Sequence, residues 1–218
     1  DEWEEVFKRI IRYNNKLVWH TFFGRGTGLS NIGEYMIPRL EEMGYDVYAN
    51  DWNSGTSVVL DDHIRELYNK YKKNENKINF EEHPQVLSWL MESYPYIKGN
   101  WKIGFSFVES TRLREYYMRH TNMMDYLITS CEHNRAVQRK SGVVAPIRII
   151  PPFVNEDIFK YIDRKHEGKP FTFLHIGVIQ ERKNTAQLIE GYLRAFEDDG
   201  RTKLIIKSGD FGILEKIK

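Results

Sequence analysis

Short apolar runs alternate along the chain with segments in which apolar residues recur at helical spacing. The runs that we expect to form buried strands are residues 16–23, 45–50, 85–91, 101–108, 125–129 and 147–150. Helical spacing predicts helices over residues 3–11, 30–43, 64–71, 111–120 and 132–140. We expect Pro38 to strain the second of these helices and Gly44 to end it. This alternation favours a doubly wound α/β domain, a parallel sheet covered by helices on both faces.

A second domain is expected after a polar segment. We expect residues 1–160 to form the first Rossmann-like domain, 161–170 a charged linker, and 171–218 the beginning of a second Rossmann-like domain. There, a buried strand at 171–176, a helix at 185–196 and a strand at 203–207 repeat the opening of the first domain. Only 48 residues follow Pro170, which predicts an incomplete second domain.

Composition and charge narrow the classes of partner. The net charge of the chain is only +1. Obligatory binding of a nucleic acid normally needs a strongly positive protein surface, so we expect no nucleic-acid partner. The single cysteine, Cys131, excludes an internal disulfide framework and suits a reducing compartment. An acidic start, and the lack of any run of about 20 apolar residues, predict a cytoplasmic protein.

Peripheral contact with a membrane is kept as an alternative for residues 112–120. This segment combines Arg112, Arg114, Arg119 and His120 with two tyrosines. As a helix it could touch anionic lipid or a glycan acceptor. A solvated helix face with one tyrosine packed inward is the commoner arrangement of such residues.

A glycine-rich turn follows the first predicted strand. Three of the five residues 24–28 are glycine, which lets backbone N–H groups approach a phosphate at the start of the next helix. The third glycine comes one residue too early for the dinucleotide pattern G-x-G-x-x-G. Asp51, at the end of the second strand, could mimic the ribose-binding acid of that pattern. A NAD-dependent oxidoreductase is therefore a remote alternative, and a tight turn without a ligand is another.

Several segments, taken in order, resemble the family 4 glycosyltransferases. These are retaining enzymes of the GT-B type, with two facing doubly wound domains. Residues 26–30 and 40–47 resemble the family's glycine loop, first helix and second strand. The passage from its acceptor domain into the linker is similar to residues 125–130, Asn134, 140–143 and 147–155 with Phe159. The opening of its donor-binding domain is similar to residues 173–177 and 182–184.

The resemblance implies a hexosyltransferase-like reaction in which a nucleoside diphosphate leaves. Preorganised cations stabilise such a leaving group, and the resemblance assigns this role to Arg182 and Lys183. The arginine that usually follows the strand glycine in the family corresponds to Val178 here, which places more of the role on this pair. Glu109 would position the sugar or the acceptor hydroxyl. The alternatives are exposed loop residues for the basic pair and a partly buried salt bridge for Glu109.

Donor binding is expected to involve the first domain as well. The resemblance implies that Gly26, Thr27 and Gly28 supply backbone donors to the diphosphate when the domains close. Ser130 and Asn134 match positions near the cleft, although either could instead cap the helix after Thr129, the commoner role.

The resemblance implies no cofactor and no metal, and the chain contains no Asp-x-Asp motif. The expected partners are a nucleotide-sugar donor and a glycan, lipid or small-molecule acceptor. A second chain could complete the donor domain. The competing function is a non-catalytic module derived from the GT-B fold that binds a glycan or a protein.

Overall fold

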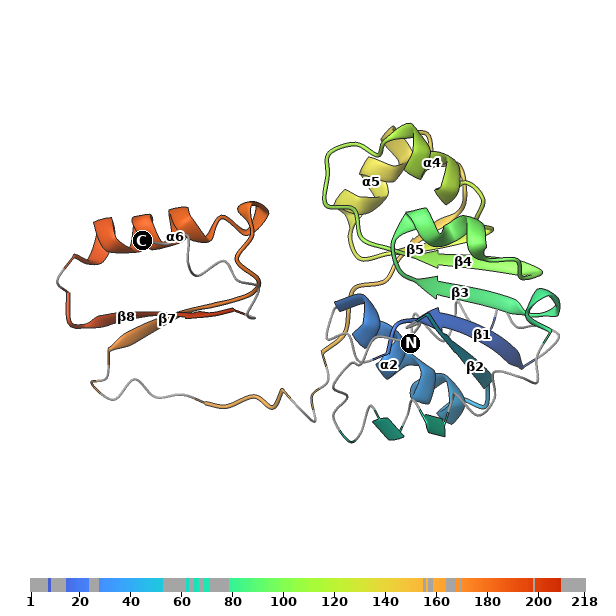
Figure 1. Ribbon diagram of the computed structural model, residues 1–218, viewed down its shortest axis with the longest axis horizontal. Coiled ribbons are helices and arrows are strands. Elements are labelled where there is room, and N and C mark those ends of the chain that lie inside the picture. Colours follow the sequence, from blue (N-terminus) through green and yellow to red (C-terminus); the bar gives the residue numbers. More distant parts are fainter. Residues whose placement is uncertain are drawn as a thin grey trace. The chain divides into compact units, whose positions relative to one another are not determined.

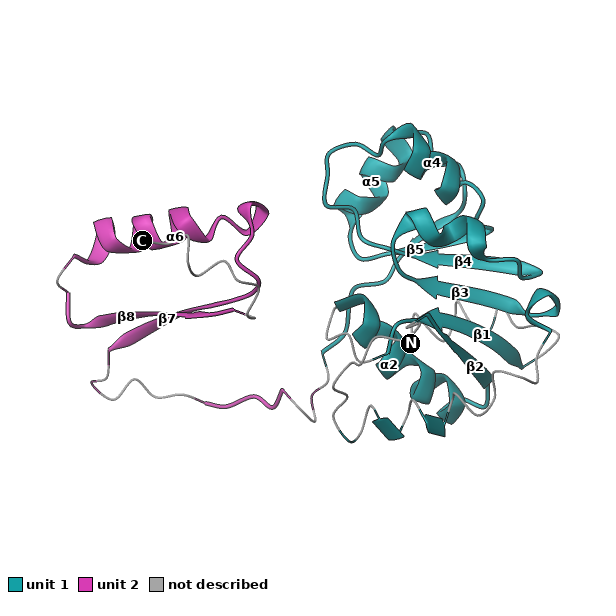
Figure 2. Cartoon of the chain, in the orientation of Figure 1, with its two compact units in different colours: residues 1–154 teal, residues 155–218 magenta. Residues whose placement is uncertain are grey.

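The computed structural model of the chain describes residues 8, 15–23, 28–52, 62, 65–66, 69–70, 79–154, 156, 159–163, 168, 170–197 and 199–208. The chain divides into two compact units, residues 1–154 and 155–218 (Figure 2). Most residues of the two predicted helices at 3–11 and 64–71 lie outside the described residues. Gly26 and Thr27 of the glycine turn also lie outside them.

Unit 1 is built on a six-stranded sheet in which every neighbouring pair of strands is parallel. The strand order is β2-β1-β3-β4-β5-β6 (Figure 1). The strands are β1 (Lys16–Thr21), β2 (Asp46–Asp51), β3 (Pro84–Ser88), β4 (Trp101–Phe105), β5 (Tyr126–Thr129) and β6 (Ile147–Ile149). The predicted parallel α/β sheet is confirmed, and its order is consistent with a Rossmann-like fold.

Helix α2 (Gly28–Glu42) covers one face of the sheet. Its apolar side packs into a core that includes Trp19 of β1 and Ile37 of the helix, both fully buried. The helix approaches β1 closely because Gly33 has no side chain: a Cβ atom there would lie 2.6 Å from Thr21 Oγ1. This contact fixes the start of α2 beside the carboxyl end of β1.

The second face of the sheet carries its own core. It is covered by a short helical segment after β3 and by the two helices α4 and α5, which lie together in Figure 1. Leu87 of β3 and Leu127 of β5 belong to this core, because alternate residues of a strand point to opposite faces. The covering elements are η3 (Met91–Tyr96), α4 (Glu115–Thr121) and α5 (Glu132–Lys140).

A buried polar network lies on this second face, beside β1 and β3. His20 Nε2 lies 2.8 Å from the amide oxygen of Gln85, and the amide nitrogen of Asn50 lies 3.0 Å from His20 Nδ1. Because an amide oxygen only accepts, His20 carries its proton on Nε2, and Nδ1 accepts from Asn50. Gln85 donates to the backbone oxygen of Phe80 over 2.6 Å. Burial lowers the pKa of His20 to about 4.

Acidification is expected to destabilise unit 1 through His20. The ordinary pKa of the ring is 6.5, so between pH 6.5 and 4 the unfolded chain binds a proton that the folded chain does not. The free energy of unfolding therefore decreases as the pH is lowered from 6.5 to 4, by about 3 kcal/mol. Urea unfolding at about pH 7 and about pH 4.5 measures the loss. His20→Gln should lose less stability between these two pH values, and an equal loss would contradict the assignment.

Unit 2 contains one parallel β-α-β crossover. Strands β7 (Phe171–Ile176) and β8 (Thr202–Lys207) pair in parallel, and α6 (Thr185–Phe196) connects them. The ring of Phe173 contacts those of Tyr192 and Phe196, with centroids 5.9 and 5.3 Å apart. Helix α6 therefore covers the face of the strand pair that carries Phe173.

The strand at 171–176 has its predicted bounds but not its predicted burial. Leu174 and Ile176 are 59% and 67% exposed. They point to the face opposite Phe173, because side chains alternate along a strand. Within the described part of unit 2, the one α-helix lies on the other side of the strand pair, so the expectation of a buried strand was wrong.

Candidate functional site

The carboxyl ends of the six strands of unit 1 lie at one edge of the sheet, because all the strands are parallel. In open sheets of this kind, ligands bind outside this edge, near the point where the strand order reverses. Here the order reverses between β1 and β3. Three predicted site residues follow strands at this edge: Gly28 after β1, Glu109 after β4 and Ser130 after β5.

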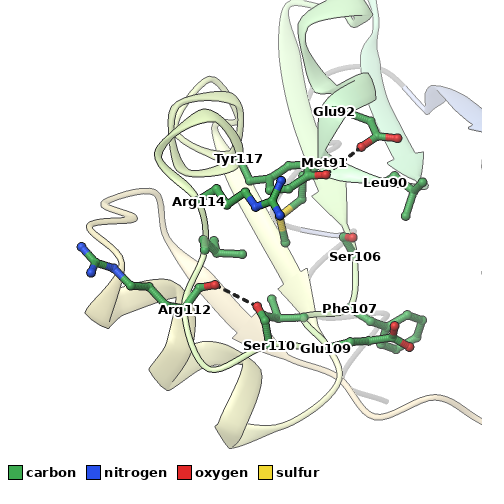
Figure 3. A pocket seen from close by; sticks show the side chains of 12 residues that line it. Leu90, Met91, Glu92, Ser106, Phe107, Glu109, Ser110, Arg112, Arg114 and Tyr117 are labelled. Atoms are coloured by element: carbon green, nitrogen blue, oxygen red, sulfur yellow. Dashed lines mark hydrogen bonds between the residues drawn. The ribbon is translucent and has the colours of Figure 1, made fainter. Parts of the chain in front are cut away.

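A cavity of about 550 Å³ opens at this edge, beside β3 and β4 (Figure 3). Its volume falls in the range of small-molecule sites. Glu92 reaches it from the segment after β3, Glu109 from the segment after β4, and Arg114 and Tyr117 from the start of α4. Sequence reasoning selected Glu109 but missed Glu92, although both are acids that follow a predicted strand. The apolar lining consists of Leu90, Met91, Phe107, Val108 and Leu113.

One wall of the cavity is a carboxylate–phenol pair. Tyr117 donates a hydrogen bond to Glu92 Oε2 over 3.2 Å. This bond raises the pKa of Tyr117, so the phenol keeps its proton. The Arg114 side chain lies beside Tyr117 in Figure 3, whereas the Arg112 guanidinium points away from the cavity. A carboxylate acceptor and a guanidinium donor therefore both line the cavity, and a hydroxyl group can donate to the first and accept from the second.

Glu109 lies at the surface of the same cavity. Its side chain is exposed rather than partly buried. The next residue, Ser110, donates from its hydroxyl group to the backbone oxygen of Arg112 over 2.9 Å, which holds the turn that follows Glu109. The carboxylate is thus carried by an ordered turn and is accessible to a ligand.

Ser130 and Asn134 contact each other directly. The Asn134 amide donates to Ser130 Oγ over 2.9 Å, and Asn134 is buried. Neither residue is the cap that was the commoner expectation, because α5 begins after Cys131 and has no side-chain cap bond. The pair instead joins the end of β5 to the first turn of α5.

Asp51 has a structural contact at the beginning of the glycine turn. Its Oδ1 atom accepts a hydrogen bond from the backbone N–H of Phe23 over 3.2 Å. The backbone N–H group of Trp52, the residue after Asp51, donates to the Thr21 carbonyl over 3.0 Å. The ends of β1 and β2 are therefore tied together where the turn leaves the sheet.

Arg182 and Lys183 occupy the equivalent edge of unit 2. They belong to the short helical segment η4 (Glu181–Lys183), which lies between the carboxyl end of β7 and the start of α6. Both side chains are exposed, as is that of Glu181. Asn184 follows in the left-handed conformation, with φ of 53°, and reverses the chain into α6. Two cationic side chains thus lie next to the positive end of the α6 dipole. Together, the side chains and the dipole favour the binding of an anion.

Comparison with protein-family models and with curated proteins finds no match for the chain. Among the residues that the structure describes, no group of three or more His, Cys, Asp or Glu side chains could hold a metal ion. The helices formed by those residues include none with the length and apolar character needed to cross a membrane.

Proposed function

We propose that the chain is a GT-B glycosyltransferase that moves a sugar from a nucleotide-sugar donor to an acceptor hydroxyl, with retention and without a metal. The observation that carries the proposal is the basic pair of unit 2. Arg182 and Lys183 are exposed between the carboxyl end of a parallel strand and the start of a twelve-residue helix. Parallel α/β units bind phosphorylated ligands at such places.

Arg182 and Lys183 would act on the leaving group. As the glycosidic bond to the diphosphate breaks, negative charge grows on the phosphate oxygens. Arg182 offers a planar fork of donors and Lys183 a compact charge, while N–H groups at the start of α6 add a fixed dipole. Groups that are already in place stabilise the transition state without reorganisation, which is how they raise the rate.

Glu109 would act on the sugar or on the acceptor hydroxyl. It lies at a cavity whose other polar groups include Glu92, Arg114 and Tyr117, which suit a polyhydroxylated ligand. A second candidate function, a non-catalytic module that binds a glycan or a protein, is favoured by one observation. The residues that line this cavity all belong to unit 1, so unit 1 could bind a ligand by itself.

The transfer reaction can be tested with UDP-, GDP- and ADP-linked hexoses. The chain is incubated with each donor and a mixed set of acceptors, and release of the nucleoside diphosphate is followed. We expect release with at least one donor, unchanged by EDTA, and a product whose anomeric configuration by NMR matches that of the donor. Inversion, or a requirement for added metal, would contradict the proposed mechanism. Glycan binding without any release would favour the module.

Glu109→Gln is expected to slow transfer while leaving the fold intact. Loss of a charged hydrogen bond to a hydroxyl group corresponds to roughly a 10- to 100-fold decrease in kcat/KM. The thermal midpoint should stay unchanged because Glu109 is exposed. Glu115→Gln is the matched control, since Glu115 is an exposed acid of α4 that pairs with Arg119. Equal kcat/KM values for the two variants would show that Glu109 has no role in transfer.

A further inference from the structure

A second cavity lies on the face of unit 1 that carries the His20 network. It has a volume of about 530 Å³. Trp52, which follows β2, borders it, as do residues 79–81, which precede β3, and Tyr96, the last residue of η3. None of its lining residues belongs to the candidate site described above. A ligand there would therefore be held by groups that the proposed transfer reaction does not use.

Aromatic rings form the walls of this cavity. Trp52 contacts His20 edge-on, with ring centroids 5.5 Å apart, and Tyr96 edge-on at 6.5 Å. Phe80 also lies near His20, with ring centroids 6.2 Å apart. Tyr96 is 73% exposed, so its ring is accessible to a ligand. The electron-rich faces of such rings attract the weakly positive C–H bonds of a ligand.

The floor of the cavity is polar and uncharged. His20 is neutral near pH 7, because burial lowers its pKa to about 4, and Asn50 and Gln85 hold it in place. At the rim, Glu81 and Lys98 contribute one charge of each sign. The cavity thus has no net charge with which to select a phosphate or a cation.

This combination matches one class of ligand better than others. A lipid chain would cover Glu81, Lys98 and the Asn50 amide without offering them hydrogen bonds, which costs free energy. A nucleotide brings a phosphate that a single lysine beside a glutamate would poorly neutralise. A pyranose ring, by contrast, has an apolar C–H face for the aromatic walls and neutral hydroxyl groups that amides recognise at their edges.

We propose that the cavity bordered by Trp52, Phe80 and Tyr96 is a carbohydrate-binding site that holds a pyranose ring of a glycan. The sugar stacks its C–H face on Tyr96, with the nearly perpendicular Trp52 ring against its edge, and its hydroxyl groups bond to the amide of Asn50 and to the rim. This site binds sugar without a nucleotide and without transfer, so its existence does not depend on the proposed function.

The test is binding of neutral oligosaccharides to the full chain. Maltoheptaose, cellohexaose, chitohexaose and mannohexaose are titrated separately and followed by saturation-transfer NMR and calorimetry. We expect at least one to bind, with Tyr96→Ala weakening its affinity at least fivefold and Tyr96→Phe, which keeps the ring, changing it less than twofold. Tyr161→Ala is the control, since Tyr161 is an exposed tyrosine of unit 2 and does not line this cavity.

Substitution of Tyr96 should leave the thermal midpoint within a degree or two, because the side chain is mostly exposed. Failure of all four oligosaccharides to bind would overturn the proposal, as would equal affinities for the Tyr96→Ala and Tyr161→Ala variants. Uridine and adenosine serve as competitors. Displacement of the bound sugar by a nucleoside at low concentration would mark the cavity as a nucleobase site and also overturn it.

Discussion

Replacing Arg182 and Lys183 together by alanine is expected to reduce sugar transfer by at least about 10³-fold, because removal of a single preorganised donor already costs about 10² to 10³ in kcat. Both side chains are exposed, so the fold of unit 2 should persist. The rate of nucleoside diphosphate release, measured with saturating donor, reports the effect on kcat. Its dependence on donor concentration reports the effect on binding.

Two further variants make this result specific. Arg182→Lys keeps the charge but loses the planar fork of donors, so it should fall between the wild type and the double variant. Arg194→Ala removes another exposed cation of unit 2, one that pairs with Glu190 on α6, and should retain the wild-type rate. A double variant with the same rate as Arg194→Ala would show that Arg182 and Lys183 do not act on the leaving group.

Trp19→Ala is expected to lower the free energy of unfolding by about 3 to 5 kcal/mol, as do other truncations of large buried aromatic residues. Trp19 is fully buried in β1, in the core beneath α2. Its Nε1–H group also donates to the buried hydroxyl of Ser88 on β3 over 3.0 Å. The substitution therefore leaves a cavity and removes the donor from Ser88. Chemical unfolding, followed by circular dichroism, measures the change.

Trp19→Phe separates the two contributions. It fills part of the space but cannot donate to Ser88, so it should cost less than Trp19→Ala. The double variant Trp19→Phe with Ser88→Ala should recover part of that loss, because no buried hydroxyl is then left without its donor. A loss below about 1 kcal/mol for Trp19→Ala would contradict the packing described for this face of the sheet.

The elements that the sequence predicted best are those with strong local patterns. Helix α5 (Glu132–Lys140), helix α6 (Thr185–Phe196) and strand β7 (Phe171–Ile176) have the predicted bounds. In α6 and β7 the apolar spacing changes clearly at both ends, whereas α5 has only Ala136 and Val137 as apolar residues. The class of the fold followed from this alternation, because strands that alternate with helices form parallel sheets.

Several strands end earlier than their apolar runs, most clearly β3 and β4. The run at 85–91 continues past β3, and that at 101–108 past β4, yet the strands stop at Ser88 and Phe105. Met91 and Val108 are still buried, because both turn into the second core of unit 1. A run of apolar residues indicates that a segment is buried. Such burial can continue after the hydrogen bonding of a strand has ended.

The boundary of α4 depends on a contact between distant segments. Residues 111–114 were predicted as helix, but α4 begins at Glu115. The Leu113 N–H group donates instead to Ser141 Oγ at the end of α5, over 2.8 Å. No local pattern reveals a bond between residues so far apart in the chain.

The candidate site was predictable only in part. The position of Glu109 after a strand is visible in the sequence, and the cavity supports that choice. The pairing of Glu92 with Tyr117 joins η3 to α4 and depends on how the two elements pack. The exposure of Leu174 could not be predicted either, because it depends on which elements cover the strand.

Calorimetric titration of the full chain with UDP, GDP and ADP tests directly whether Arg182 and Lys183 hold a nucleoside diphosphate. We expect saturable heat with at least one of the three, weakened by salt because charges carry the binding. This heat should disappear in the Arg182→Ala, Lys183→Ala double variant and persist in Arg194→Ala. Absence of binding with all three nucleotides, or binding that survives the loss of both cations, would contradict a role for the basic pair in holding the diphosphate.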